Sequence, residues 1–347
     1  MSAATSSRLE QEIREQPAVL RAALERNAEP IARIAREVRS RGPLEQVVVV
    51  ARGTSDNAAR YAQYLIGARL GLPVALAAPS LTTMYEAPVV PYGARALVIA
   101  ISQSGRSPDV VGVVASARAA DVPTLAITNV AGSPLAEAAD DVLELGVGEE
   151  RSVAATKTYT ASLLVVAALV SALAGDDEAI GPLGGAPSLV ERTIETSFEA
   201  VPRLDAHQRA RHVVAVGRGF NYATAMEVAL KLRELTGVVA EGFSPPDLLH
   251  GPIAAVAAAT PALVVAPSGR VRASVLEAAA ALAARGAACI RIDDAADADL
   301  PLPAGVPEWL SPLVAVVPGQ VLALRWAQLG GHAVDAPPGL TKVTETY

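Results

Sequence analysis

One pattern occurs twice in this chain: an apolar strand, a short turn that contains glycine and a helix, followed by a second strand, turn and helix. In the first copy Gly105 follows Gly53 by 52 residues, and in the second Gly269 follows Gly219 by 50 residues. Such closely matched intervals indicate an internal duplication. Because strands that alternate with helices form parallel sheets, the sequence predicts an α/β protein with two tandem, doubly wound parallel-sheet domains.

Composition supports two separate cores. A chain of 347 residues exceeds the usual single core of about 100–200 residues. Hydrophobic residues make up 51% of the chain but aromatic residues only 3%, so the cores must be aliphatic, which suits strands buried on both faces. The expected strands are 46–51, 97–101, 124–128, 212–216, 262–266 and 289–293. The expected helices begin after these turns and end near residues 71, 120, 235 and 284.

Other segments frame the two domains. Apolar residues at helical spacing predict a helical lead-in over 1–40, interrupted at Pro17 and Pro30. Turn-forming residues over 175–190 predict a linker. The expected domains are therefore 41–175 and 190–335, followed by a C-terminal tail over 336–347.

Charge and apolar runs exclude several classes of protein. A net charge of −7 argues against a nucleic-acid surface, which needs a basic stripe. The longest apolar stretch, 161–174, is shorter than the roughly 20 residues of a membrane span and predicts a buried helix. Residues 1–40 lack the apolar run of a signal peptide, and Cys289 is the only cysteine. A cytoplasmic protein without nucleic-acid or membrane partners is expected.

Small polar residues gather where the second expected strand ends. Ser102, Gln103 and Ser104 come directly after this strand and just before a helix, with Ser55 and Ser107 expected nearby. Hydroxyl and backbone N–H groups at a helix N-terminus favour an anion by roughly 0.3–1 kcal/mol. Capping alone needs one such residue, so the cluster favours a phosphate site. The corresponding turn of the second copy, 267–269, has a single serine, which predicts one strong anion site per chain.

A second group of charged residues lies on one expected helix. Glu227, Lys231 and Glu234 are spaced by four and then three residues, so they share one helix face. Spacing alone favours a solvated stripe of ion pairs. The apolar residues between them favour instead a partly buried cluster, in which a carboxylate can have a raised pKa and act as a base.

Two further residues could carry chemistry. His250 lies in a segment bracketed by proline and glycine, and histidine is the side chain that exchanges protons near neutral pH. Lys342 lies in the tail, and a lysine in a closed site can react with an open-chain sugar carbonyl. Each also has an ordinary structural interpretation, as a loop histidine and as a surface lysine.

Together these segments resemble the SIS (sugar isomerase) domain family, whose domains are flavodoxin-like. Within this family the chain is similar to the isomerase half of glucosamine-6-phosphate synthase. The resemblance is carried by residues 12–17, 53–55, 102–105, 153–157, 227–234, 250–252 and 342.

The resemblance implies a role for each matching residue. Glu234 would move a proton between C1 and C2 of the sugar, with Lys231 and Glu227 setting its charge environment. His250, donated by the neighbouring subunit of a homodimer, would open the sugar ring, and Lys342 would meet the open-chain carbonyl as the tail closes the active site. No metal or organic cofactor is implied. The residues expected to hold the sugar phosphate are Gly53, Thr54, Ser55, Ser102, Gln103, Ser104, Ser107, Val153 and Ala155.

Departures from the synthase pattern modify the expected reaction. Arg52 replaces a cysteine of that pattern, Arg106 a glutamate and Ala155 a serine, and we expect no glutaminase half. The chain thus looks more similar to stand-alone SIS-type deaminases. We expect conversion of glucosamine 6-phosphate and water to fructose 6-phosphate and ammonium. The alternatives are aldose–ketose isomerisation, deglycation of a sugar–amino acid adduct, ammonia-dependent synthesis and, more distantly, a non-catalytic sugar-phosphate sensor.

Overall fold

The computed structural model describes residues 6–90 and 95–342. Contacts divide this part of the chain into two compact units. The first unit comprises residues 18–90, 95–150 and 157–184, and the second comprises 6–17, 151–156 and 185–342. Each unit contains one five-stranded sheet. The domain boundaries proposed from the sequence remain a prediction.

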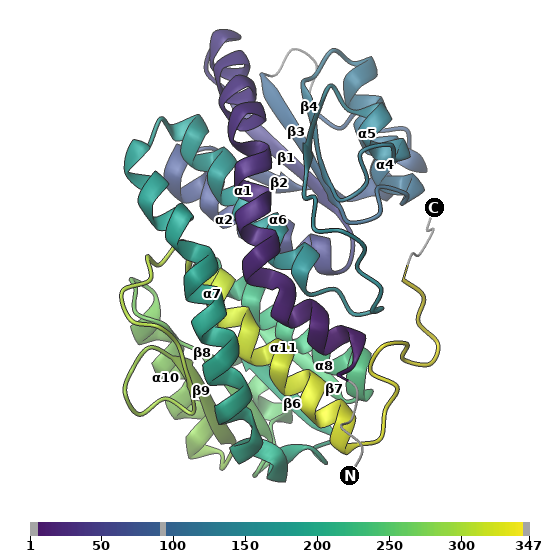
Figure 1. The fold of residues 1–347 in the computed structure, drawn as a ribbon. Helices are drawn as coiled ribbons and strands as arrows, with labels where there is room; N and C mark the ends of the chain where they lie inside the picture. Colours follow the sequence, from purple (N-terminus) through teal and green to yellow (C-terminus); the bar gives the residue numbers. More distant parts are fainter. Residues whose placement is uncertain (1–5, 91–94, 343–347) are drawn as a thin grey trace. The chain divides into compact units, whose positions relative to one another are not determined.

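The first unit is built on a wholly parallel sheet with the strand order β2-β1-β3-β4-β5. Its helices cover both faces, with α4 and α5 on one side and α2 and α6 on the other (Figure 1). This order is the flavodoxin-like, doubly wound arrangement, as predicted. Its strands are β1 Gln46–Ala51, β2 Val74–Leu76, β3 Ala96–Ser102, β4 Thr124–Thr128 and β5 Asp141–Glu144. Its principal helices are α2 Thr54–Leu70, α3 Pro79–Thr83, α4 Pro108–Ala119, α5 Pro134–Ala138 and α6 Lys157–Ala174.

The second unit repeats this topology. Its parallel sheet has the order β10-β9-β8-β6-β7. Read from the other edge, this is the order of the first sheet with five added to each strand number, which supports the internal duplication. Its strands are β6 His212–Val216, β7 Val239–Phe243, β8 Pro261–Val265, β9 Ala288–Asp293 and β10 Leu300–Pro301. Its helices include α8 Tyr222–Thr236, α9 Pro245–Leu249, α10 Arg272–Ala284 and α11 Ser311–Leu329, with short 3₁₀ turns at Val201–His207, Gly219–Asn221 and Pro252–Ala255.

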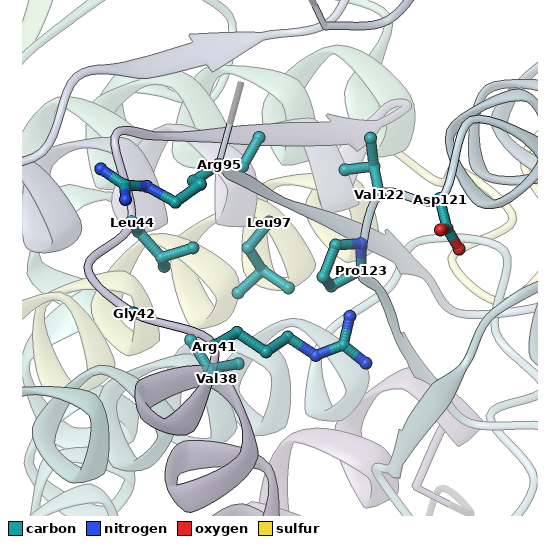
Figure 2. A pocket seen from close by; sticks show the side chains of 10 residues that line it. Val38, Arg41, Gly42, Leu44, Arg95, Leu97, Asp121, Val122 and Pro123 are labelled. Atoms are coloured by element: carbon teal, nitrogen blue, oxygen red, sulfur yellow. The ribbon is translucent and has the colours of Figure 1, made fainter. Parts of the chain in front are cut away.

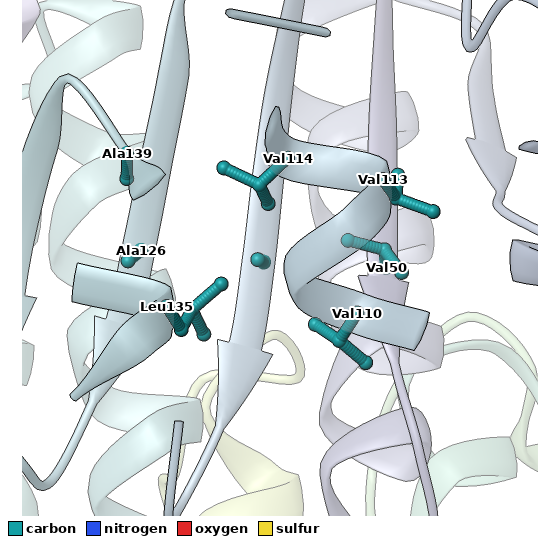
Figure 3. Packing of buried hydrophobic residues seen from close by; sticks show 8 residues of the cluster. Val50, Val110, Val113, Val114, Ala126, Leu135 and Ala139 are labelled. Carbon is teal, nitrogen blue, oxygen red and sulfur yellow. The ribbon is translucent and has the colours of Figure 1, made fainter. Parts of the chain in front are cut away.

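The cores are aliphatic, as the composition predicts. In the first unit Val110, Val113 and Val114 of α4 pack with Leu135 of α5 against β1, β3 and β4 (Figure 3). The corresponding cluster of the second unit is built from Val214, Val216, Leu248, Val256, Ala262, Ala278 and Leu282. Among the described residues only α6 is long and apolar enough to span a membrane, and 78% of it is buried inside the protein, as expected of a core helix.

Two expectations about helices are wrong. Helix α1 runs without a break over Arg8–Ser40, so Pro17 and Pro30 do not interrupt it. Its apolar face is buried along its whole length, from Leu9 to Val38, and this packing outweighs the lost backbone hydrogen bonds of the two prolines.

The expected turn-rich linker is largely helical as well. After a short 3₁₀ turn at Asp177–Ala179, helix α7 covers Ile180–Ala200 and includes several glycines and Pro187. Leu183, Ala186 and Val190 are buried at helical spacing, so tertiary packing overrides the weak helix propensity of glycine at this position.

Candidate functional site

The two polar loops of the first unit meet at one edge of its sheet. Strands β1 and β3 are parallel neighbours, with Ala51 paired to Ile101, so the chain leaves both strands at the same edge. This is also where the strand order reverses, because β1 is followed along the chain by β2 on one side and then by β3 on the other. Open α/β sheets bind ligands at such a switch point, outside the carboxyl ends of the strands.

The loop after β1 requires a glycine. Gly53 has φ 58° and ψ −130°, a conformation open to glycine alone, and a Cβ atom there would meet no atom within 4 Å. The turn is closed by the Ser55 N–H, which donates to the Arg52 carbonyl oxygen at 3.1 Å. Thr54 and Ser55, both half-buried, begin α2 directly after this exposed glycine. The loop therefore leaves its backbone accessible to a ligand at the N-terminus of a 17-residue helix.

The turn after β3 is held together by its own hydroxyl groups. The buried Ser102 Oγ accepts from the Gly105 N–H at 3.1 Å, and Ser104 Oγ accepts from the Arg106 N–H at 3.3 Å. The Gln103 carbonyl oxygen accepts from the backbone N–H of Asn129 at 3.2 Å. Gly105 has φ 62°, and a Cβ atom there would collide with Ser133, so this turn also requires a glycine.

Ser107 occupies the N-cap position of α4 without acting as a side-chain cap. Its carbonyl oxygen accepts from the Val111 N–H at 3.0 Å, but its hydroxyl group makes no capping hydrogen bond. Capping therefore does not explain the serine, and its half-buried hydroxyl lies at the start of a 12-residue helix. The structure thus brings together the predicted residues Gly53, Thr54, Ser55, Ser102, Gln103, Ser104 and Ser107.

The charged residues of α8 form a buried ion-pair cluster. The side chains of Glu227 and Lys231 are 0% and 1% exposed, and Lys231 Nζ lies 3.4 Å from Glu227 Oε1. Lys231 also contacts Glu234 Oε2, and the Glu234 side chain is 22% exposed. The interpretation of these residues as a solvated stripe is therefore wrong. Glu234 is the most accessible member of a cluster with two carboxylates and one ammonium.

Close packing fixes α8 in the second unit. Gly319 of α11 lies so close to Val228 that a Cβ atom on the glycine would overlap the valine side chain. Gly242 of β7 approaches the Met226 backbone, which a Cβ atom would reach at 2.8 Å. These two glycines let α11 and β7 pack closely against α8 at Val228 and Met226, the chain neighbours of Glu227. This close packing holds the buried cluster in place.

The segment 151–156 is anchored by two residues that our sequence analysis did not single out. The buried carboxylate of Glu12 accepts from the backbone N–H groups of Arg151 and Ser152 at 2.5 and 3.3 Å. The Asp335 carbonyl oxygen accepts from the Val153 N–H at 3.2 Å, and its carboxylate accepts from the Leu9 N–H at 2.9 Å. The Val153 N–H is thus already bonded within the protein. The one available signal for Glu12 was its place in the 12–17 segment that carries the family resemblance.

The remaining predicted residues lie in the second unit. His250 is exposed at the C-terminal end of α9, where its backbone N–H donates to the Pro246 carbonyl oxygen at 3.0 Å. Ala155 is half-buried in the segment 151–156, and Lys342 is half-buried as the last described residue. The rest of the predicted tail, 343–347, lies outside the described residues.

A hollow in the first unit lies away from the serine-containing loops. Its volume is about 190 Å³, and its floor is formed by Leu44, Leu97 and Pro123, with Arg41 and Arg95 at its rim (Figure 2). Leu97 lies near the start of β3, and Pro123 directly precedes β4. The hollow is therefore at the amino ends of the strands, whereas the serine-containing loops leave their carboxyl ends.

The fold and these loops define an α/β sugar-isomerase-type domain pair, and the chain belongs to the SIS domain family. The family model for the SIS domain matches residues 43–172 and 208–304. These two stretches contain all the strands of the two sheets, so the match supports the duplication.

Known relatives extend this similarity over the chain. It is 33% identical over 342 residues to glutamine–fructose-6-phosphate aminotransferase [isomerizing] of Pyrococcus horikoshii, an alignment covering 95% of this chain and 56% of the relative. The chain thus spans about half the length of the curated relatives it matches. A crystal structure of a candidate phosphosugar isomerase from Silicibacter pomeroyi has a TM-score of 0.85 and 32% identity, covering 95% of this chain and 99% of that one. Glucosamine-6-phosphate deaminase of Thermotoga maritima shares the fold, with a TM-score of 0.83 at 22% identity, covering 98% and 100% of the two chains.

Proposed function

We propose that this protein is an amino-sugar phosphate deaminase that converts glucosamine 6-phosphate and water into fructose 6-phosphate and ammonium. The buried Glu227–Lys231 pair with the accessible Glu234 beside it is the observation that carries this proposal. Burying such charges is unfavourable, and a protein that only senses a sugar phosphate has no need of them.

The phosphate group would bind in the first unit. Backbone N–H groups at the start of α2 and α4, together with the hydroxyls of Ser55, Ser104 and Ser107, would donate hydrogen bonds to its oxygens. Two helix N-termini that meet at the switch point between β1 and β3 support this assignment.

The proton transfers would involve the second unit. His250, supplied by the neighbouring subunit of a homodimer, would open the pyranose ring, and Lys342 would meet the resulting C1 aldehyde. Glu234 would remove the C2 proton to give an enolamine and would return a proton to C1. The resulting C2 imine would add water and release ammonia, so the atoms balance without an oxidant or reductant. General acid–base catalysis of this kind contributes about 10²–10⁴-fold for each group.

The exposed position of His250 in the single chain supports a shared site. A histidine that must act on a buried sugar is expected to be covered by a partner, whereas here it lies at the surface at the end of α9. The homodimer is therefore part of the proposal, with gel filtration and cross-linking as its tests.

Incubation with a panel of hexosamine 6-phosphates, with ammonium and ketose phosphate both measured, tests the proposed reaction. We expect equal amounts of the two products from glucosamine 6-phosphate and none from unphosphorylated glucosamine at the same concentration. Ketose phosphate formed from an aldose phosphate without ammonium would indicate simple isomerisation instead. Consumption of fructose 6-phosphate and ammonia, without the reverse reaction, would indicate synthesis.

A further inference from the structure

Arg52 is one of the residues in which this chain departs from the synthase pattern, and its side chain has a defined partner. Arg52 Nε donates to Asp109 Oδ2 at 2.6 Å. The Asp109 side chain is only 1% exposed, whereas that of Arg52 is 51% exposed. The Nε atom of Arg52 is thus held by a buried carboxylate, while about half of the arginine side chain is open to solvent.

Asp109 lies in the first turn of α4, two residues after Ser107. Its Oδ1 atom accepts from the Val110 N–H at 2.8 Å, and Val110 packs into the core beside β1 and β3 (Figure 3). Both carboxylate oxygens therefore have donors, which hold the carboxylate at the helix N-terminus. An uncompensated carboxylate here would repel a phosphate bound at the same turn, and Arg52 supplies the compensating charge.

The path of the Arg52 side chain leads past the proposed phosphate site. Arg52 directly follows Ala51, and Ser102 directly follows Ile101, the residue paired with Ala51 in the sheet. The side chain reaches from the end of β1 to Asp109, which lies two residues beyond the turn that contains Ser102–Ser107.

The guanidinium group has donors left for a ligand. It carries five N–H donors in a rigid plane, and the bond to Asp109 uses the one on Nε. In the described part of the chain the structure records no other hydrogen bond from the Arg52 side chain. The terminal nitrogens are suited to the bidentate recognition of phosphate oxygens, which is the usual role of arginine in anion sites.

We propose that Arg52 is a direct ligand of the substrate's phosphate group, with Asp109 as the positioning residue that holds its guanidinium in place. This inference rests on the proposed function of the serine-containing loops as a sugar-phosphate site. It assigns a phosphate contact to a residue outside the set expected from the family. Arg106 is exposed at the same turn, where its backbone N–H donates to Ser104 Oγ, and no side-chain anchor of this kind is recorded for it among the described residues.

The test compares variants that separate direct contact from simple charge compensation. Dissociation constants for fructose 6-phosphate are measured by calorimetry for the wild type, Arg52→Gln, and the double variant Arg52→Gln/Asp109→Asn. The matched control is Arg95→Gln, which removes an equally exposed arginine, paired with Glu45, from the opposite edge of the same sheet. Thermal unfolding of each variant checks that it is folded.

A direct contact predicts that Arg52→Gln weakens binding by about tenfold or more, that the double variant stays equally weak, and that Arg95→Gln binds normally. Wild-type affinity in the double variant would overturn the proposal, because it would show that Arg52 only compensates Asp109. Unchanged binding by Arg52→Gln would overturn it as well. Should the double variant fail to fold, Arg52→Lys replaces it, since lysine keeps the charge but has no second donor nitrogen. Weaker binding of fructose 6-phosphate by Arg52→Lys would support a direct contact, and wild-type affinity would overturn it.

The outcome for the proposed function is read separately. If the wild type binds fructose 6-phosphate and releases ammonium from glucosamine 6-phosphate while Arg52→Gln binds equally well, only the role of Arg52 is wrong. If the wild type binds no sugar phosphate, the proposed function is wrong and the inference about Arg52 is wrong with it.

Discussion

The ammonium group of Lys231 lies 3.4 Å from the carboxylate of Glu227, and both side chains are almost completely buried. A charge that is removed from water in this way is tolerated only when it is paired. Because Lys231 also contacts Glu234, one lysine compensates two carboxylates of α8.

Replacing this lysine should therefore strongly destabilise the protein. Lys231→Met removes this ammonium group from the buried Glu227 carboxylate, and we expect a loss of about 3–5 kcal/mol in the free energy of unfolding, measured with urea. The double variant Lys231→Met/Glu227→Leu removes both charges and should recover much of this loss. A single variant as stable as the wild type would show that the pair is not energetically coupled.

Alanine variants of Gly53 and Gly71 test whether the loop before α2 contributes to binding as well as to stability. Both have positive φ, and a Cβ atom would have free space at each, so alanine introduces only backbone strain, about 1–2 kcal/mol at the left-handed Gly71 and more at Gly53, whose ψ of −130° lies outside the left-handed helical region. Gly53→Ala should also weaken the binding of fructose 6-phosphate, because it distorts the loop before α2. Gly71→Ala, at the other end of the same helix, should lower the melting temperature without affecting affinity. Equal affinity in both variants would exclude the Gly53 loop from the site.

Ser107 and Ser133 make a similar comparison between two helix starts. The Ser133 hydroxyl caps α5 by accepting from the Ala136 N–H at 3.3 Å, so Ser133→Ala should cost about 1 kcal/mol of stability. Ser107 has no such bond, and Ser107→Ala should leave stability within about 0.5 kcal/mol of the wild type. If the Ser107 hydroxyl binds phosphate, its loss should nevertheless raise the dissociation constant for fructose 6-phosphate several-fold. If Ser107→Ala lost stability but kept its affinity for fructose 6-phosphate, the Ser107 hydroxyl would have a structural role and would not bind phosphate.

Asp205 should contribute to the acid stability of the second unit. Hydrogen bonds from the Arg325 guanidinium hold the pKa of the Asp205 carboxyl below its usual value. Since this pKa is lower in the folded than in the unfolded chain, the stabilisation is present above the unfolded pKa and is lost as the pH falls through the folded one. The pair is partly exposed, so we expect Asp205→Asn to cost only about 0.5 kcal/mol at pH 7. The stability difference from the wild type should disappear in acid, and a difference that grows there would contradict this account.

The sequence predicts the central strands of both sheets well because they are short apolar runs with a neighbour on each side. Strands β1, β4 and β6 begin and end at the predicted residues. The edge strands β2, β5, β7 and β10 are missed because they are short and have only one neighbour, and the apolar runs of β5 and β7 are interrupted by charged residues. Helix α7 is missed for a different reason, since the glycines and prolines of 175–190 describe local propensity and not the packing that determines its structure.

The polar site is predictable to the extent that it is local in the sequence. Ser102, Ser104 and Ser107 lie within one turn, and Glu227, Lys231 and Glu234 within one helix, so spacing alone groups them. The Arg52–Asp109 pair joins residues 57 positions apart, and the contacts of Glu12 with Arg151 and Ser152 join residues about 140 apart. Such pairs depend on the fold and leave no local pattern.

The most direct test of the account is the release of ammonium from glucosamine 6-phosphate by Glu234→Gln. The matched control is Glu241→Gln, which alters an exposed glutamate of β7 that pairs with His212. We predict that the wild type and the control release ammonium with fructose 6-phosphate, whereas Glu234→Gln binds fructose 6-phosphate normally and releases none. Ammonium release by Glu234→Gln at the wild-type rate would contradict the central claim that this carboxylate moves the proton.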